Sequence, residues 1–297
     1  MSHRHPAGGD GHGGPRSFST RLERAKIGAM KIDITLRNMG PESTPELLRE
    51  CARAAEDAGL DAVWVADHIA IPPDDAEGSN GRYLDPLATL AFLAAATTRI
   101  GLGVGVLVLP YRPPLPTAKW LATIQELSAG RLLFGAGVGW MAPEFRALGV
   151  DRRRRGAIAD ETLAVINRCF AADEVELNGQ RFLFRPRPQR PPMLIGGAPP
   201  HALRRAVRFG DGWMPMGLPP DDLRAPVAEL RRLAAAAGKP SPEVAVFTRL
   251  PIEDAAQVRE LVREYADAGA TRLIHAARYT DAAGYRRQVE GLAKIRG

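Results

Sequence analysis

Residues 127–140, LSAGRLLFGAGVGW, are the most informative stretch of this chain. The polar turn SAGR leads into a short apolar strand, which ends in alternate glycines at Gly135, Gly137 and Gly139. Alternate glycines at the end of a buried strand predict that the backbone passes close to something flat or anionic. Residues 141–143, MAP, interrupt any following helix, so this is not the dinucleotide-binding fingerprint. The stretch is typical of one strand in a repeated β/α array, with a ligand over its carboxyl end.

The same alternation of strand and helix continues on both sides of this stretch. Strands are predicted at residues 31–36, 61–66, 100–107, 132–137, 193–195, 213–216, 243–248 and 271–274. Helices are predicted at residues 44–58, 86–97, 115–128, 157–170, 200–209, 221–237, 255–268 and 281–295. About eight strands alternating with about eight helices predict an α/β protein with a (β/α)₈ TIM barrel rather than an open doubly wound sheet. The active site of such a barrel lies at the carboxyl ends of the strands.

The alternation of strands and helices is interrupted once, between the fourth and fifth predicted strands. Residues 174–184 alternate in polarity around Asn178-Gly179, which predicts a small inserted hairpin. Residues 1–29 are rich in Gly, His, Arg and Ser without apolar periodicity, so we expect a disordered N-terminal tail. The barrel domain is expected to occupy residues 30–297.

The composition is that of an ordinary globular chain, with 45% hydrophobic and 25% charged residues. No apolar run approaches the roughly 18 residues of a membrane helix, and the N-terminus lacks a secretory pattern, so neither is expected. Cys51 and Cys169 fall in predicted helices without metal-ligand spacing. We therefore expect free thiols, no metal site and a cytoplasmic location.

The net charge of +6 does not indicate a nucleic-acid partner. Half of it lies in residues 1–29, and the dense basic run at 152–155 has no interleaved aromatic residues that could stack on bases. We therefore expect small molecules, and neither nucleic acid nor membrane, as partners.

Asp67 and His68 directly follow the strand that carries Trp64. A histidine at the carboxyl end of a barrel strand stands where acid/base catalysts are placed. It could equally cap the strand. Asp67 either orients the imidazole or serves the turn, and His275, at the end of the last strand, is a second candidate.

Two further glycine clusters are candidate cofactor sites. Gly103 and Gly105 alternate with Gly101 in IGLGVGVLVLP, which indicates either a cofactor surface or close packing inside the barrel. Gly196, Gly197 and Ala198 lie between a strand and a helix, where backbone N–H groups favour a phosphate. A tight left-handed turn is the alternative reading of the second cluster.

Together, GLDAVWVADH, ATTRIGLGVGVLVLP, LSAGRLLFGAGVGWMAPEF, RRGAIADE and PPMLIGGAPPHALRRAVRFGDGW resemble the luciferase-like monooxygenase superfamily. They look most like its coenzyme F420-dependent oxidoreductase branch, over residues 30–297. The resemblance implies a (β/α)₈ barrel, often dimeric, that holds a flavin-like ring over the strand ends. Against the family pattern, Arg37-Asn38 is an unusual pair after the first strand.

The resemblance also assigns roles to individual residues. It implies a cis peptide at Gly105-Val106 under the ring, acid/base chemistry at Asp67-His68, and a ring pocket shaped by Trp64 and residues 103–106. Further implied residues are the GxGW positions Gly137, Gly139 and Trp140, the phosphate loop Gly196-Gly197, and structural pairing by Glu144 and Arg155.

The resulting expectation is a homodimeric oxidoreductase that moves a hydride between coenzyme F420 and a small organic substrate. An FMN-dependent monooxygenase using O₂ and a non-catalytic flavin- or deazaflavin-binding barrel are the alternatives. Substrate determinants are expected in residues 67–85, in the YRPPLP loop and in the hairpin.

Overall fold

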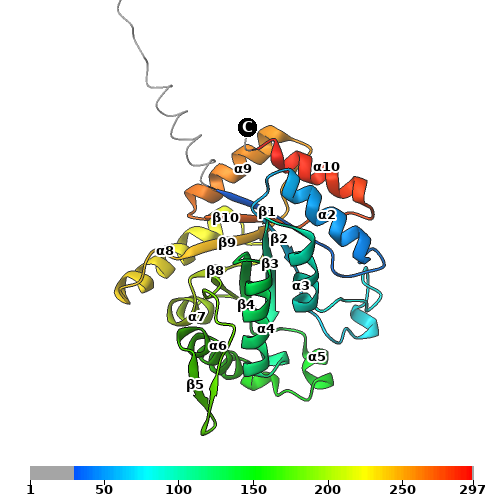
Figure 1. Cartoon of the computed structure of the whole chain (residues 1–297). Coiled ribbons are helices and arrows are strands. Elements are labelled where there is room, and N and C mark those ends of the chain that lie inside the picture. Colours follow the sequence, from blue (N-terminus) through cyan, green and yellow to red (C-terminus); the bar gives the residue numbers. More distant parts are fainter. Residues whose placement is uncertain (1–29, 296–297) are drawn as a thin grey trace, which may run out of the picture.

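The computed structural model describes residues 30–295, in which eight parallel strands close a barrel (Figure 1). Around the barrel the strand order is β1-β10-β9-β8-β7-β4-β3-β2. The strands are β1 (Lys31–Thr35), β2 (Ala62–Val65), β3 (Gly101–Val108), β4 (Leu132–Gly137), β7 (Met193–Gly196), β8 (Gly212–Met214), β9 (Glu243–Thr248) and β10 (Arg272–His275). The predicted TIM barrel is confirmed, and the predicted tail, residues 1–29, lies outside the described residues.

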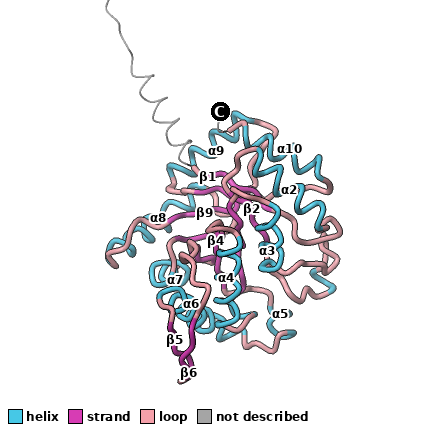
Figure 2. The backbone as a smooth tube through the Cα atoms, viewed as in Figure 1, coloured by secondary structure: helices cyan, strands magenta, loops and turns pink. Residues whose placement is uncertain are grey.

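Helices cover the outside of the barrel (Figure 2). They are α2 (Pro45–Asp57), α3 (Pro86–Ala96), α4 (Pro114–Leu127), α5 (Ala142–Ala147), α6 (Arg155–Ala171), α7 (His201–Phe209), α8 (Pro220–Ala236), α9 (Ala255–Asp267) and α10 (Ala282–Ala293). Short 3₁₀ turns occur at Pro73–Asp75, Leu109–Tyr111 and Arg152–Arg154. Of the α-helices, only the short α5 was not predicted. Within residues 30–295 no helix has both the length and the apolar character to cross a membrane.

The predicted hairpin is present as β5 (Glu174–Leu177) and β6 (Gln180–Leu183), an antiparallel pair that projects from the barrel (Figure 1). Asn178 and Gly179 have φ angles of 52° and 75°, as the tight turn requires. The hairpin connects α6 to β7, so it lies toward the amino ends of the strands. That end is opposite the expected active-site face of a (β/α)₈ barrel.

The interior of the barrel is filled by aromatic rings that the glycines of β3 accommodate. Trp64 is fully buried and meets the Phe247 ring edge-on. A Cβ on Gly103 would lie 2.3 Å from the Trp64 ring, and one on Gly105 would lie 2.4 Å from the Phe247 ring. Gly103 and Gly105 therefore allow close packing of these rings, which is one of the two explanations that the sequence leaves open.

A buried ionic cluster lies against Trp64. The Trp64 indole N–H donates to Asp33 Oδ2 over 2.6 Å, and Arg272 Nη1 lies 2.6 Å from the same oxygen. Arg272 Nε reaches Glu243 Oε1 at 2.6 Å. Strands β1, β9 and β10 are thus joined by side chains as well as by backbone hydrogen bonds.

Glu56 fastens α2 to the turn that enters β3. Its carboxylate accepts the backbone N–H groups of Thr98, Arg99 and Ile100 over 2.7–2.9 Å. Burial pushes the pKa of this carboxyl upward, but the three N–H donors outweigh it and lower the pKa to about 2. The charged form is the one that these donors stabilise.

Glu56 is therefore expected to contribute to acid stability. Because the folded-state pKa lies below the ordinary value of 4.5, the contribution is complete above about pH 4.5 and is lost as the pH falls toward 2. Glu56→Gln is expected to lower the free energy of unfolding by about 1–2 kcal/mol at pH 7 and by much less near pH 3. Urea denaturation at the two pH values measures this, and an equal loss at both would contradict it.

Candidate active site at the carboxyl ends of the strands

A cleft of about 330 Å³ opens where β2, β3, β4 and β7 end. Its lining comprises Ala66, Asp67, His68, Gly105, Val106, Val108, Tyr111, Gly137, Val138, Gly139, Trp140, Glu144, Gly196, Gly197 and Met216. A larger groove of about 920 Å³ lies between α10 and the loop after β9 and shares none of these residues. The smaller cleft is the better candidate, because it gathers most of the residues singled out by the sequence at the face where barrel enzymes work.

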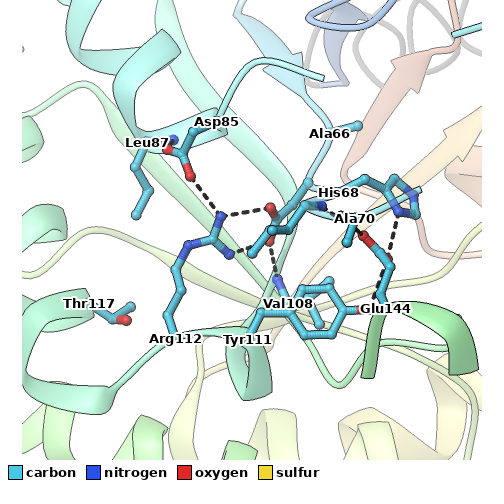
Figure 3. Close-up of polar contacts among 12 residues, drawn as sticks. Ala66, His68, Ala70, Asp85, Leu87, Val108, Tyr111, Arg112, Thr117 and Glu144 are labelled. Atoms are coloured by element: carbon cyan, nitrogen blue, oxygen red, sulfur yellow. Dashed lines mark hydrogen bonds and ion pairs between the residues drawn. The ribbon is translucent and has the colours of Figure 1, made fainter. Parts of the chain in front are cut away.

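The side chain of His68 is held by Glu144. Their Nδ1 and Oε2 atoms lie 2.9 Å apart, and Glu144 is fully buried (Figure 3). Glu144 also accepts the N–H groups of Ile69 and Ala70 and the hydroxyl of Tyr111, at 2.7, 3.0 and 2.9 Å. Burial raises the pKa of Glu144, but the Ala70 and Ile69 donors and His68 together hold it below its ordinary value. Glu144 is therefore an anion that orients the imidazole.

This arrangement decides which nitrogen of His68 serves the cleft. A carboxylate only accepts hydrogen bonds, so Nδ1 carries the proton that points to Glu144. No residue within 30–295 forms a hydrogen bond with Nε2, which is left for a ligand. Tyr83 and Trp140 flank the ring, with centroids 4.9 and 6.3 Å from that of His68. His68 is thus fixed in position with one free nitrogen.

Asp67 does not orient the imidazole. Its two oxygens accept both Nη groups of Arg112 over 2.7 and 2.9 Å, and Oδ2 also accepts the N–H of Val108 at 2.8 Å. Arg112 Nη2 also donates a hydrogen bond to Asp85 Oδ2 over 2.8 Å (Figure 3). Asp67 thus serves the turn, and Glu144 performs the orienting role considered for Asp67.

A local signal for α5, which carries Glu144, was present in the sequence. Pro143 and Glu144 form a helix-start pattern, a proline in the first turn with an acid beside it. After three alternate glycines, however, Pro143 also fits an interruption of the chain, which is the interpretation given above. The contact between Glu144 and His68 was not visible locally, because 76 residues separate them.

The side chain of Val106 fills the space beside the glycines at the ends of β4 and β7. A Cβ on Gly137 would lie 2.3 Å from Cγ2 of Val106, and one on Gly196 would lie 2.8 Å from Cγ1 of Val106. The Gly105-Val106 peptide is cis, as the resemblance implies, and the β3–β4 register shifts between Val104 and Leu107. Val106 thus sits in a notch between two strands and forms part of the cleft floor.

Gly137→Ala is expected to lower the free energy of unfolding by about 1–3 kcal/mol, because the new methyl group overlaps Val106. Adding Val106→Ala vacates the space and is expected to restore much of the loss. Gly156→Ala in α6 is the matched control, since its Cβ would meet only Arg205 Nη2 at 3.5 Å. Chemical denaturation of the three variants measures this, and a Gly137→Ala protein as stable as the control would contradict it.

The predicted phosphate loop borders the cleft at one end. Gly196 and Gly197 line the cleft, whereas Ala198 is exposed beyond it. Gly197 has a φ angle of 117°, which favours glycine, and its carbonyl accepts the indole N–H of Trp213 at 2.8 Å. The loop leads into the amino end of α7, where helix N–H groups favour an anion. The turn conformation and the anion-binding hypothesis are thus compatible.

Several residues named from the sequence lie outside the cleft. Trp64 and Gly103 are in the barrel interior beneath it, and the hairpin contributes no lining residue. His275 is buried with both ring nitrogens engaged, by Leu250 N–H and Gln288, and its pKa is lowered by burial. Arg155 forms no ion pair within residues 30–295, so the implied pairing is absent for Arg155 and present for Glu144.

The unusual Arg37-Asn38 pair fastens loops. Asn38 is buried and bonds the backbone of Ala66 and Leu84. Arg37 donates to the carbonyls of Tyr279 and Gly78. Neither side chain lines the cleft. Asn38 positions the end of β2, and Arg37 joins the loop after β10 to the loop after β2.

The structure is a closed (β/α)₈ barrel with a histidine–carboxylate pair and glycine-rich strand ends around one cleft. This combination is typical of (β/α)₈-barrel enzymes, whose active sites lie at this face. Residues 30–294 match the model of the luciferase-like monooxygenase family, and the chain belongs to this family. Members of the family are oxidoreductases, including monooxygenases.

Similar proteins include an uncharacterized protein, a monooxygenase and a solved F420-dependent dehydrogenase. An uncharacterized protein of Mycobacterium tuberculosis is 34% identical over 209 residues, which cover 64% of this chain and 72% of the relative. The 4-hydroxyprotoasukamycin monooxygenase of Streptomyces nodosus subsp. asukaensis is 31% identical over 225 residues, 69% of this chain and 57% of that protein. A solved F420-dependent secondary alcohol dehydrogenase, in complex with an F420-acetone adduct, superposes with a TM-score of 0.75 at 19% identity, over 90% of this chain and 99% of its own. The last likeness shows the fold alone.

Proposed function

We propose that this protein binds coenzyme F420 over the cleft and catalyses hydride transfer between the deazaflavin and a small organic substrate. The observation that carries the proposal is the His68–Glu144 pair, which leaves His68 Nε2 without a partner at a cleft with an apolar floor. An oriented imidazole beside a redox ring is suited to the proton transfer that accompanies hydride transfer.

The residues present fit a flavin-like group. Val106, Val108 and Val138 provide apolar surface, and the cleft volume of about 330 Å³ lies at the lower end of ligand pockets. Gly197 and Ala198 would present backbone N–H groups to the phosphate ahead of α7. No lysine or arginine side chain from residues 30–295 lines the cleft, so the backbone would provide this anion site.

When bound, the deazaflavin supplies the hydride-accepting or hydride-donating ring carbon. The chain's own residues do the remaining work. His68 Nε2 accepts or donates the substrate proton, and Glu144 stabilises the imidazolium when Nε2 is protonated. Asp67 and Arg112 hold the end of β3, which carries Val106, in place.

The second candidate is an FMN-dependent monooxygenase using O₂, favoured by the 31% identity to a monooxygenase. The same apolar floor and phosphate loop would hold FMN. A barrel that binds either ring without turnover is the third possibility, and it predicts tight binding with no electron transfer to a carbonyl, imine or activated alkene.

The proposed assembly is a homodimer, as the resemblance implies. Helix α3 carries no charged residue, and its exposed side is formed by Ala88, Phe92 and Ala95 next to Trp120 of α4. A helix that is apolar on all sides is normally buried. Sedimentation analysis tests the dimer, and Phe92→Glu is expected to dissociate it.

Side-by-side fluorescence titrations with coenzyme F420 and FMN test the proposed function. Saturable binding of the deazaflavin alone supports it, and preference for FMN supports the monooxygenase. If the protein binds neither cofactor, the cofactor assignments at the cleft are wrong. Ala198→Asp places a carboxylate on the exposed phosphate loop and is expected to weaken binding at least tenfold, whereas the matched Ala198→Ser is expected to bind normally.

A further inference from the structure

The rim of the cleft is apolar and exposed. The side chains of Ile69, Trp140 and Met216 are 45%, 66% and 61% exposed. They belong to three different loops, after β2, β4 and β8, and Trp140 and Met216 line the cleft itself. Within residues 30–295 these are three of the seven large hydrophobic side chains that are exposed. Their convergence on one concave site indicates a contact surface for a ligand.

The charges at the cleft are already paired. Asp67 is bound by Arg112, and Glu144 is bound by His68, Tyr111 and two backbone N–H groups. No lysine or arginine of the described chain lines the cleft to meet an anion. A carboxylate or phosphate on a substrate would lose its hydration there without meeting a side-chain cation, and the backbone N–H groups of Gly197 and Ala198 are those proposed to hold the phosphate of the cofactor.

A cationic group is no better accommodated. The carboxylate of Glu144 is fully buried behind the His68 ring, and Arg112 neutralises Asp67. The atoms that a ligand would meet first are the indole of Trp140 and the thioether of Met216. Trp140 stands edge-on to His68 with 6.3 Å between ring centroids, so a molecule held against it lies beside the free imidazole nitrogen.

We propose that the substrate is an uncharged, largely apolar molecule held between Trp140 and Met216 next to His68, and that charged molecules of the same shape are rejected. The inference rests on the proposed function, since it concerns the molecule that would meet the bound ring. It names the substrate class and assigns Trp140 and Met216 as specificity determinants.

The test uses naphthol, naphthoate and naphthylmethylammonium, all substituted at the same ring position. Calorimetric titrations measure each probe against the cofactor-loaded and the cofactor-free full-length protein near neutral pH. Naphthol is expected to bind at least tenfold more tightly than either charged probe in both forms. Naphthoate or naphthylmethylammonium binding as tightly as naphthol would overturn the inference.

Three variants locate the binding. Trp140→Ala is expected to weaken naphthol binding about tenfold, because it removes an aromatic contact. Leu183→Ala, which removes an equally exposed large hydrophobic side chain from the hairpin, is the control and is expected to leave the affinity unchanged. Met216→Lys adds the missing counter-charge and is expected to make naphthoate the preferred probe. Unchanged naphthol affinity in Trp140→Ala, or unchanged preference in Met216→Lys, would count against the proposal.

Failure of this inference is distinguishable from failure of the proposed function. Cofactor binding without the expected ranking of the probes overturns the substrate class alone. Loss of cofactor binding with the ranking intact on the free protein overturns the oxidoreductase proposal and leaves the apolar ligand site standing.

Discussion

His68→Ala is expected to lower turnover by about 10²–10⁴-fold while the affinity for the cofactor stays unchanged. The reason is geometric, because Nε2 is the only side-chain nitrogen of a lining residue in residues 30–295 that is free to exchange a proton at the cleft. The side chain is 19% exposed, so truncation is not expected to unfold the protein. Steady-state kinetics combined with the fluorescence titration measures the two effects separately.

Glu144→Gln is the companion variant for this prediction. Glutamine keeps the volume of the side chain but can donate an N–H to Nδ1 of His68. The variant therefore no longer enforces the tautomer in which Nδ1 carries the proton. Glu144 is a positioning residue, so kcat is expected to fall while KM changes little. Leu183→Ala, in the hairpin that contributes no residue to the cleft, serves as the control with normal kinetics. Unchanged turnover in His68→Ala would rule out the proposed role of the histidine.

Arg272→Leu is expected to lower the free energy of unfolding by about 3–5 kcal/mol. Arg272 and Asp33 are both buried, and their Nη1 and Oδ2 atoms lie 2.6 Å apart. The other oxygen of Asp33 has no hydrogen-bond partner, so the carboxylate depends on Arg272 and on the Trp64 indole. Removal of the guanidinium leaves a buried carboxylate without its cation, and urea denaturation at neutral pH reports the loss.

Two further variants separate the unpaired charge from the lost packing. Asp33→Leu combined with Arg272→Leu removes both charges and is expected to recover part of the stability. Arg232→Met removes the arginine of an exposed pair with Glu229 on α8 and is expected to change the stability by at most about 0.5 kcal/mol. A loss below 1 kcal/mol in Arg272→Leu would show that the cluster is not a major source of stability.

The order of the elements was predictable because its signals are local. Each signal depends only on residues that are close in the sequence. Examples are the periods of two and 3.6 residues, the threonine cap followed by Pro45, and the turn at Asn178-Gly179. The structure has the cap and the turn where the sequence predicts them. Helix α5 was not predicted because its six residues are too few to show helical periodicity, and the start pattern at Pro143 and Glu144 alone does not establish a helix. The location of His68 was also predictable from the sequence, because the residue directly follows a predicted strand.

The sequence alone predicts that this chain forms a β/α barrel and that His68, Trp140 and Gly197 lie at the carboxyl ends of its strands. The tertiary structure is needed to show which groups meet there. Glu144, rather than the adjacent Asp67, reaches the imidazole, and Val106 of one strand fills the space left by Gly137 and Gly196 of two others. These contacts join residues far apart in the chain. They depend on barrel closure and on the direction in which each side chain leaves its strand, and no local pattern encodes either.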